Sequence, residues 1–160
     1  MTAVVRTVHR ATIAAPLEVA VALARDVSAW PDLLSDYRWC RIHEQTPNRL
    51  VFSMGAWIRG WPARWTAVQE LHLSPRCIVF RHIGGLTRGM LVEWRFVPNG
   101  GGVDVEIVHE LVLPWPWIGR LVSDRIVGPW FIDHIARRTL KAVQARAEAA
   151  GRRTSGGAAG

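Results

Sequence analysis

The stretch AAPLEVAVALARDVSAWPDLLSDY, Ala14–Tyr37, lies between one run of residues with strand-like alternation and a longer series of such runs. Its first half predicts a short helix, because Pro16 stands in the first turn and the apolar residues after it recur at helical spacing. Its second half, Ala29–Tyr37, contains Trp30-Pro31 and is typical of a turn or a single helical turn. Short helices are therefore expected to interrupt a sheet directly after its first strand.

The rest of the chain continues this pattern on both sides. A β-branched, alternating run predicts the first strand, and five or six more are separated by turn residues. Their expected bounds are Val4–Ile13, Trp39–Glu44, Arg49–Trp57, Ala63–Leu73, Cys77–Ile83, Met90–Pro98 and Val103–Leu113. A long amphipathic helix, broken at Gly128-Pro129, then runs to about Ala150. This order predicts an α+β fold, in which a curved antiparallel sheet and one long helix enclose a space for large side chains or a ligand.

Length and composition fit one domain over residues 1–150, followed by a flexible tail over residues 151–160. The chain has 160 residues, of which 49% are hydrophobic and 21% charged, so a disordered chain is excluded. No apolar run approaches the 20 or so residues of a membrane span, and no secretory signal is visible. Cys40 and Cys77 lack the spacing of a zinc site or a disulfide framework. We expect a cytoplasmic protein without metal or cofactor.

Two features of the composition are unusual, namely the excess of arginine and the nine tryptophans beside one tyrosine. The net charge is +7, and Lys141 is the only lysine. The basic residues are dispersed along the chain, which favours a soluble surface over nucleic-acid binding. Each tryptophan by itself is best placed in the core, but several fall where a cavity wall is expected.

Strand alternation assigns side chains to the two faces of the sheet. The predicted inward set is largely apolar, and it includes Trp65, Met90, Trp94 and Ile107. Three polar residues share it, which are Gln69, His109 and, with weaker alternation, Arg81. Buried polar groups need partners, water or a cavity, so each is either a satisfied core residue or part of a site. Arg81 has a further alternative, in which it reaches solvent at a sheet edge. The outward set includes His43, His72 and His82.

The segments Ala14–Val19 and Asp26–Tyr37 resemble the N-terminal signature of the polyketide cyclase/aromatase family, which belongs to the START-like (SRPBCC) superfamily with its helix-grip fold. The resemblance implies a deep cavity that holds a poly-β-ketone delivered by an acyl carrier protein. It also implies that an inward arginine, a tyrosine after the Trp-Pro motif and bound water direct aldol closure and dehydration. Gln69 stands where relatives carry an arginine, so Arg81 or Arg59 is the nearest substitute. His82 matches a family histidine.

These observations give a hypothesis for the site. Arg81 would stabilise an enolate, Tyr37 would donate a proton or position the substrate, and His109 would act as acid and base. The substrate-binding residues would be Trp30, Arg59, Trp65, Gln69, Met90, Trp94 and Ile107. The expected partners are a hydrophobic small molecule, an acyl carrier protein and a second copy in a homodimer. One alternative is a non-catalytic carrier of a quinone, lipid or isoprenoid. Another is a toxin-like module that binds the ribosome through its basic surface.

Overall fold

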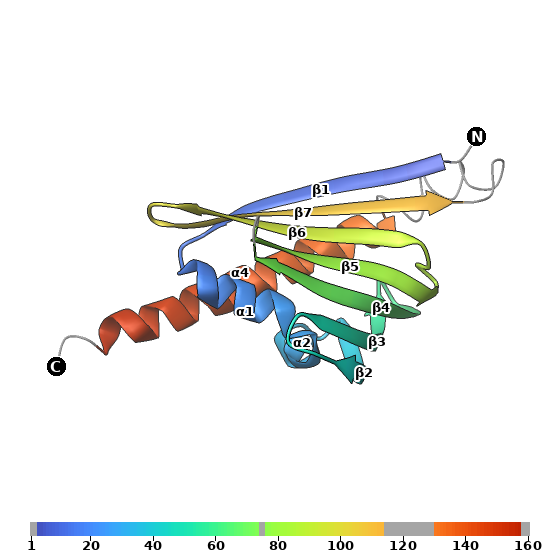
Figure 1. Ribbon diagram of the computed structural model, residues 1–160, viewed down its shortest axis with the longest axis horizontal. Helices are drawn as coiled ribbons and strands as arrows, with labels where there is room; N and C mark the ends of the chain where they lie inside the picture. The colour runs from blue at the N-terminus through green and yellow to red at the C-terminus, as the bar shows by residue number, and fades with distance from the viewer. Residues whose placement is uncertain (1–2, 74–75, 114–129, 158–160) are drawn as a thin grey trace.

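One antiparallel sheet and a long helix dominate the structure, a computed structural model that describes residues 3–73, 76–113 and 130–157. The seven strands lie in the order β1-β7-β6-β5-β4-β3-β2. Their bounds are β1 Ala3–Ile13, β2 Tyr37–Gln45, β3 Arg49–Ile58, β4 Trp61–Leu73, β5 Arg76–Gly85, β6 Met90–Asn99 and β7 Gly102–Leu113. The helical elements are α1 Leu17–Arg25, η1 Val27–Ala29, α2 Trp30–Leu33 and α4 Asp133–Gly156. This arrangement confirms the predicted fold class, and Figure 1 shows α4 running along one face of the sheet.

The stretch after β1 folds as its residues predict. Pro16 precedes α1, whose Ala20 and Ala24 are fully buried, and Pro31 occupies the first turn of α2. Proline suits these places because its missing N–H would have no partner inside the helix. The stretch brings the chain from one edge strand of the sheet, β1, to the other, β2. From β2 the chain forms a meander back across the sheet, and its last strand, β7, pairs with β1.

The inner face of the sheet and one face of α4 form the core. The predicted amphipathic character of α4 is confirmed, because Ala136, Thr139, Leu140, Val143 and Ala147 are buried. On β6 and β7 the predicted alternation is confirmed as well. The residues buried on this inner face are Met90, Val92, Trp94, Phe96, Val103, Val105, Ile107, His109 and Leu111, and Val108 is buried on the other face. Burial of these apolar side chains supplies most of the driving force for folding.

Two expectations about elements are wrong. The helix α4 does not end near Ala150 but continues to Gly156, and the hydroxyl groups of Thr154 and Ser155 donate to the Gly151 carbonyl in its last turns. On β5 the predicted alternation is inverted, since Phe80 and His82 face inward. The predicted break at Gly128-Pro129 lies outside the described residues. Within those residues, no helix is long and apolar enough to cross a membrane.

Candidate functional site

A cavity of about 70 Å³ lies between the inner face of the sheet and the first half of α4. Seven aromatic side chains line it, Trp30, Tyr37, Phe52, Trp65, Phe80, Trp94 and Phe131. The polar side chains in its wall are Tyr37, His82, Thr87, His109 and Thr139, and the other lining residues are Ile58, Met90, Val92, Ile107, Ile132, Ile135 and Ala136. This volume holds a few water molecules. A larger ligand therefore requires the lining side chains to move apart.

Trp30 links the Trp-Pro motif to the cavity wall. Its indole lies 5.2 Å from the ring of Tyr37, 5.9 Å from Phe80 and 6.1 Å from Trp94, measured between ring centroids. Its Nε1–H donates to the Leu23 carbonyl, 3.2 Å away, at the end of α1. Tilted ring contacts of this kind add to the burial energy of each aromatic group. The helical stretch after β1 thus fixes one wall of the cavity.

Tyr37 meets α4 through a chain of hydroxyl groups. The Thr139 hydroxyl donates to the Ile135 carbonyl at 2.7 Å, so the Tyr37 O–H donates to the Thr139 oxygen at 2.6 Å. Burial raises the pKa of Tyr37 well above its ordinary value. The phenol is therefore neutral at pH 7, and the free lone pair of its oxygen is an acceptor for a ligand in the cavity.

His82 is held at the β5 side of the cavity. Its ring stacks on Trp65 with centroids 5.8 Å apart, and its Nδ1 lies 2.6 Å from the Thr87 hydroxyl oxygen. Burial lowers the pKa of this imidazole to about 4, because charge is disfavoured among apolar groups. The ring is neutral at pH 7. When the Thr87 hydroxyl donates to Nδ1, the His82 Nε2–H is left as a hydrogen-bond donor.

His109 lies on β7, next to the side chain of His9 on the edge strand β1. Burial first, and then the neighbouring His9 and His82, lower its pKa to about 3. The His9 ring meets it edge to face at 6.4 Å, and the His9 Nε2 lies 2.6 Å from the Asp133 carboxylate. Burial raises the pKa of Asp133, but the hydrogen bonds of His9 and Arg137 outweigh this effect and keep the carboxyl ionised.

Three buried polar atoms on β1 and β7, at or behind this part of the wall, have no hydrogen-bond partner among the described residues. They are the Nδ1 atoms of His9 and His109 and the hydroxyl oxygen of Thr7, which pairs across the strands with His109. Leaving such atoms unpaired costs free energy, so they favour water or a ligand oxygen as partner. Beside His109, the pair of His9 and the partly exposed Asp133 connects this region to the surface of the protein.

The structure brings together seven of the ten predicted site residues. Tyr37, His109, Trp30, Trp65, Met90, Trp94 and Ile107 all line the cavity. The other three, Arg81, Gln69 and Arg59, do not line it. Sequence reasoning did not place His82 or Thr87 in the wall, although the motif resemblance singled out His82. Thr139 is recoverable from the spacing of the inward face of α4.

The prediction that Arg81 faces inward is wrong, because its side chain is 58% exposed on the outer face of β5. It lies 3.6 Å from the Glu70 carboxylate there. The sequence of β5 does not indicate which residues face inward, because residues 77–80 are all apolar and fit either face. The guanidinium that would stabilise an enolate is therefore absent from the described cavity wall, which contains no lysine, arginine, aspartate or glutamate.

Gln69 and Arg59 lie elsewhere as well. The Gln69 amide is buried, but its Nε2–H donates to the Arg25 carbonyl at the end of α1, 3.0 Å away. Arg59 and Gly60 form the two-residue turn between β3 and β4, with φ of 52° and 82°. Positive φ at both positions is typical of a type I′ hairpin turn. The Arg59 guanidinium lies 5.6 Å from the Trp130 ring centroid, where it makes a cation–π contact.

Comparison with known proteins gives a family and a set of similar folds. The model of the family "polyketide cyclase / dehydrase and lipid transport" matches residues 13–128. The Zhui aromatase/cyclase from Streptomyces sp. R1128 is 19% identical with a TM-score of 0.80, covering 91% of this chain and 94% of that one. TTHA0849 from Thermus thermophilus is 23% identical with a TM-score of 0.76, covering 92% of this chain and 99% of that one.

A START superfamily protein from Mycobacterium smegmatis is 17% identical with a TM-score of 0.65, covering 94% of this chain and 99% of that one. No curated protein matches the chain. At these identities the solved structures show the fold alone, which is the START-like helix-grip fold that the motif resemblance implied.

Proposed function

Since the chain belongs to the polyketide cyclase/dehydrase and lipid transport family, we propose that it binds a poly-β-ketone in the cavity and directs its aldol cyclisation and dehydration. The observation that carries the proposal is the wall itself, with seven aromatic side chains and two buried, neutral imidazoles. Aromatic walls favour a folded, stackable chain. Holding such a chain in one conformation raises the rate and selects among ring closures that occur without help.

His109 is the proposed proton acceptor. Aldol closure begins when a base removes a proton from the carbon between two carbonyl groups, and the carbanion then attacks a third carbonyl carbon. A neutral imidazole is ready to accept that proton. The enolate that forms is an anion close to the new imidazolium, so it offsets the burial that otherwise disfavours the charged ring. The proton then returns to the alkoxide oxygen formed by the attack.

His82 and Tyr37 are the proposed groups that hold the ligand oxygens. The Nε2–H of His82 is suited to donate to the enolate oxygen, because its ring is fixed by Trp65 and Thr87. The Tyr37 oxygen accepts a hydrogen bond from the new hydroxyl group and so positions it. That hydroxyl then leaves as water together with the proton of the neighbouring carbon, and a C=C bond forms in the ring that the aldol step has closed. We further propose that an acyl carrier protein delivers the substrate, which the net charge of +7 supports since such a partner would be acidic.

A non-catalytic carrier of a hydrophobic ligand is the second candidate. The absence of any charged side chain from the described cavity wall favours it, because enolate chemistry gains most from a fixed positive charge. Such a carrier needs only the aromatic wall and would release its ligand unchanged.

The test uses a carrier-bound poly-β-ketone and the variants His109→Gln and Tyr37→Phe. If the chain is a cyclase, His109→Gln lowers formation of the cyclised product by about 10²-fold, the usual scale for one acid–base group. Tyr37→Phe is expected to shift the product distribution, because it removes the ligand acceptor and the bond to Thr139. Products are separated by liquid chromatography and identified by mass.

Arg81→Gln is the matched control, since this side chain lies outside the cavity and its product distribution should equal that of the wild type. Wild-type product distributions in His109→Gln and Tyr37→Phe, together with unchanged ligand recovered from the protein, would contradict the cyclase and support the carrier.

A further inference from the structure

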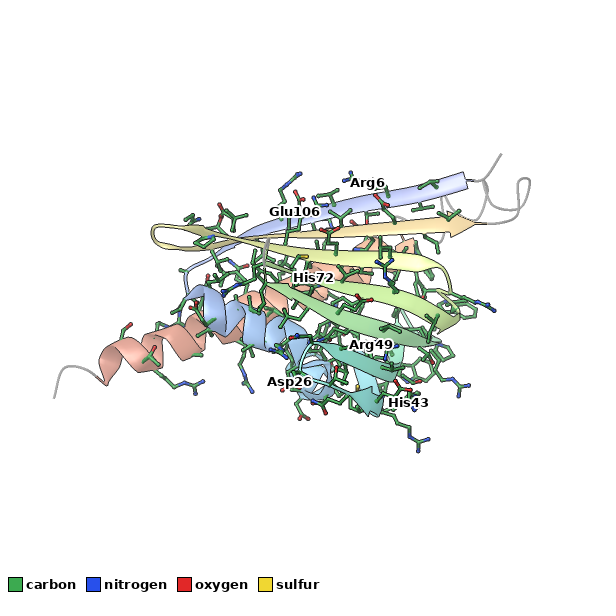
Figure 2. The ribbon with its side chains drawn as sticks, viewed as in Figure 1. Arg6, Asp26, His43, Arg49, His72 and Glu106 are labelled. Atoms are coloured by element: carbon green, nitrogen blue, oxygen red, sulfur yellow. The ribbon has the colours of Figure 1, made fainter. Side chains whose placement is uncertain are left out.

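A second depression lies on the outer face of the sheet, on the side away from α4. It spans β2, β3 and β4, reaches Gly85 at the end of β5, and has a volume of about 670 Å³. We call it the β2–β4 groove, and the side chains used below are Trp39, Arg41, His43, Ser53, Arg64 and Thr66. Figure 2 shows His43 beside β2, far from Glu106 on β7. The site does not rest on the function proposed for the cavity.

A row of hydrogen-bonding groups crosses the floor of the groove. The His43 Nε2 lies 2.8 Å from the Ser53 hydroxyl oxygen, which lies 2.8 Å from that of Thr66. Ser53 and Thr66 are directly opposed in the β3–β4 ladder, so the backbone holds the row in place. Each of the three side chains keeps capacity for a further hydrogen bond, and these can be offered to a ligand.

Trp39 supplies a flat wall beside this row. Its indole lies against Gly55, where a Cβ atom would overlap the ring, so glycine is what allows the ring to lie on the strand. The Trp39 residue is 41% exposed. Exposed tryptophan held in a fixed position is a good surface for a planar group, since little conformational freedom is lost on binding.

The charges of the groove are unbalanced. Arg41 and Arg64 have no carboxylate partner among the described residues, and no aspartate or glutamate lines the groove. A second groove of about 630 Å³ on β1, β6 and β7 behaves differently, because Arg10 and Arg95 there are paired with Glu106 at 2.7 and 3.1 Å. Within the described ranges, the arginines of one groove are thus paired with carboxylates, and the two of the other groove are not.

We propose that the β2–β4 groove binds an organic phosphate, with the phosphate on Arg41 and Arg64 and a planar group on Trp39. Two positive charges match a phosphate dianion better than a carboxylate monoanion. Guanidinium groups bind phosphate through two parallel hydrogen bonds each. When the His43 Nε2–H donates to Ser53 and Ser53 donates to Thr66, the Thr66 hydroxyl is left to donate to the third oxygen. An open site of this kind is screened by salt, so its affinity falls as ionic strength rises.

The experiment titrates phenyl phosphate into the protein and follows the indole N–H and backbone amide signals of β2–β4 by NMR. We expect a Kd on the order of 1 mM at low salt, and benzoate should bind at least about 5-fold more weakly, since it carries one negative charge rather than two. Arg41→Gln and Arg64→Gln should each weaken phenyl phosphate binding about 5- to 10-fold, since each removes one charge-assisted contact. Trp39→Leu should weaken binding of phenyl phosphate but leave that of inorganic phosphate unchanged.

Arg10→Gln is the matched control, because it removes an arginine of the same sheet face whose charge is already paired. Its Kd for phenyl phosphate should equal that of the wild type. The proposal is overturned if the β2–β4 signals do not move, if Arg41→Gln and Arg64→Gln bind as the wild type does, or if Arg10→Gln weakens binding as much as they do. The last result would indicate attraction by net charge alone.

Discussion

The two ends of the space between the sheet and α4 are built from different side chains. At the closed end, six small or β-branched residues are fully buried, namely Ile13, Ala20, Ala24, Val103, Val143 and Ala147. At the cavity end, seven aromatic rings and two imidazoles surround a space of about 70 Å³. Both ends contact the same helix α4 and the same strand β7. The two ends thus differ in the size of their side chains, small at the solid core and large around the cavity.

The closed end shows what keeps the helices close. Alanine on α1 and on the second half of α4 lets the two helices pack against each other and against β7, while rigid aromatic groups at the other end cannot interdigitate without gaps. The closed end is apolar, whereas the cavity end holds buried groups that can titrate. We therefore expect stability to depend mainly on the closed end, and binding on the cavity end.

Two isoleucines that are both 0% exposed test this difference directly. Ile13→Ala at the closed end should lower the free energy of unfolding by about 3–5 kcal/mol, near the top of the range for such deletions. Ile107→Ala in the cavity wall should cost about 2–3 kcal/mol, because that side chain faces a space and has fewer atoms to lose contact with. Urea denaturation of both variants measures the two losses.

The comparison fails if Ile107→Ala costs as much as Ile13→Ala or more. Equal slopes of the unfolding free energy against urea concentration in the two variants would show that both losses refer to the same transition.

Acid should weaken the cavity end selectively. The folded protein holds the pKa of His82 near 4 and that of His109 near 3, below the 6.5 of an exposed imidazole. Their neutral forms thus contribute fully above pH 6.5, and the contribution is lost as the pH falls through that value toward 4 and 3. Between pH 7 and pH 5 each imidazole should lower the free energy of unfolding by up to about 2 kcal/mol.

His109→Gln removes one of these groups, so its unfolding free energy should fall less steeply with pH than that of the wild type. His72→Gln is the control, because this imidazole lies on the outer face and is about half exposed. A wild-type slope in His109→Gln, measured by urea denaturation between pH 7 and pH 5, would contradict a buried neutral His109.

Much of the cavity end could be predicted from the sequence because its strands alternate cleanly. On β6 and β7 the charged residues Glu93, Arg95 and Glu106 mark the outer face, so Trp94, Ile107 and His109 were placed correctly. The Trp-Pro motif likewise located Trp30 and Tyr37. In each case a local pattern carried the information, and the tertiary structure agreed with it.

The failures occur where local patterns carry no direction. The run CIVF at residues 77–80 fits either face, and a register shift between Thr66 and Ala67 follows where β4 pairs with β5. The alternation could therefore not decide between Arg81 and His82. The role of Gln69 depends on a contact with Arg25, 44 residues away, which spacing does not encode.

Composition did not decide where the tryptophans lie. Trp57 and Trp61 are 48% and 62% exposed, contrary to the expectation of a core position. Both lie next to the tight Arg59-Gly60 turn at the end of the β3–β4 ladder, where Trp57 pairs with Pro62 and Trp61 with Ile58, so the two rings lie on opposite faces of the hairpin end. Trp30 and Trp94, by contrast, are buried, and their rings lie 6.1 Å apart between centroids.

Substitution of Arg81 has the smallest expected effect on stability. It tests whether the outer face of β5 is separate from the cavity end. Its guanidinium is 3.6 Å from Glu70 with both side chains exposed, so Arg81→Gln should change the free energy of unfolding by less than about 0.5 kcal/mol. The affinity of the cavity for an apolar fluorescent dye should also be unchanged, whereas Trp94→Ala should reduce it. Thermal unfolding and a dye titration measure the two quantities. A loss of dye affinity in Arg81→Gln as large as that in Trp94→Ala would mean that β5 turns its other face to the ligand, and the separation of the cavity end from the outer face would then be wrong.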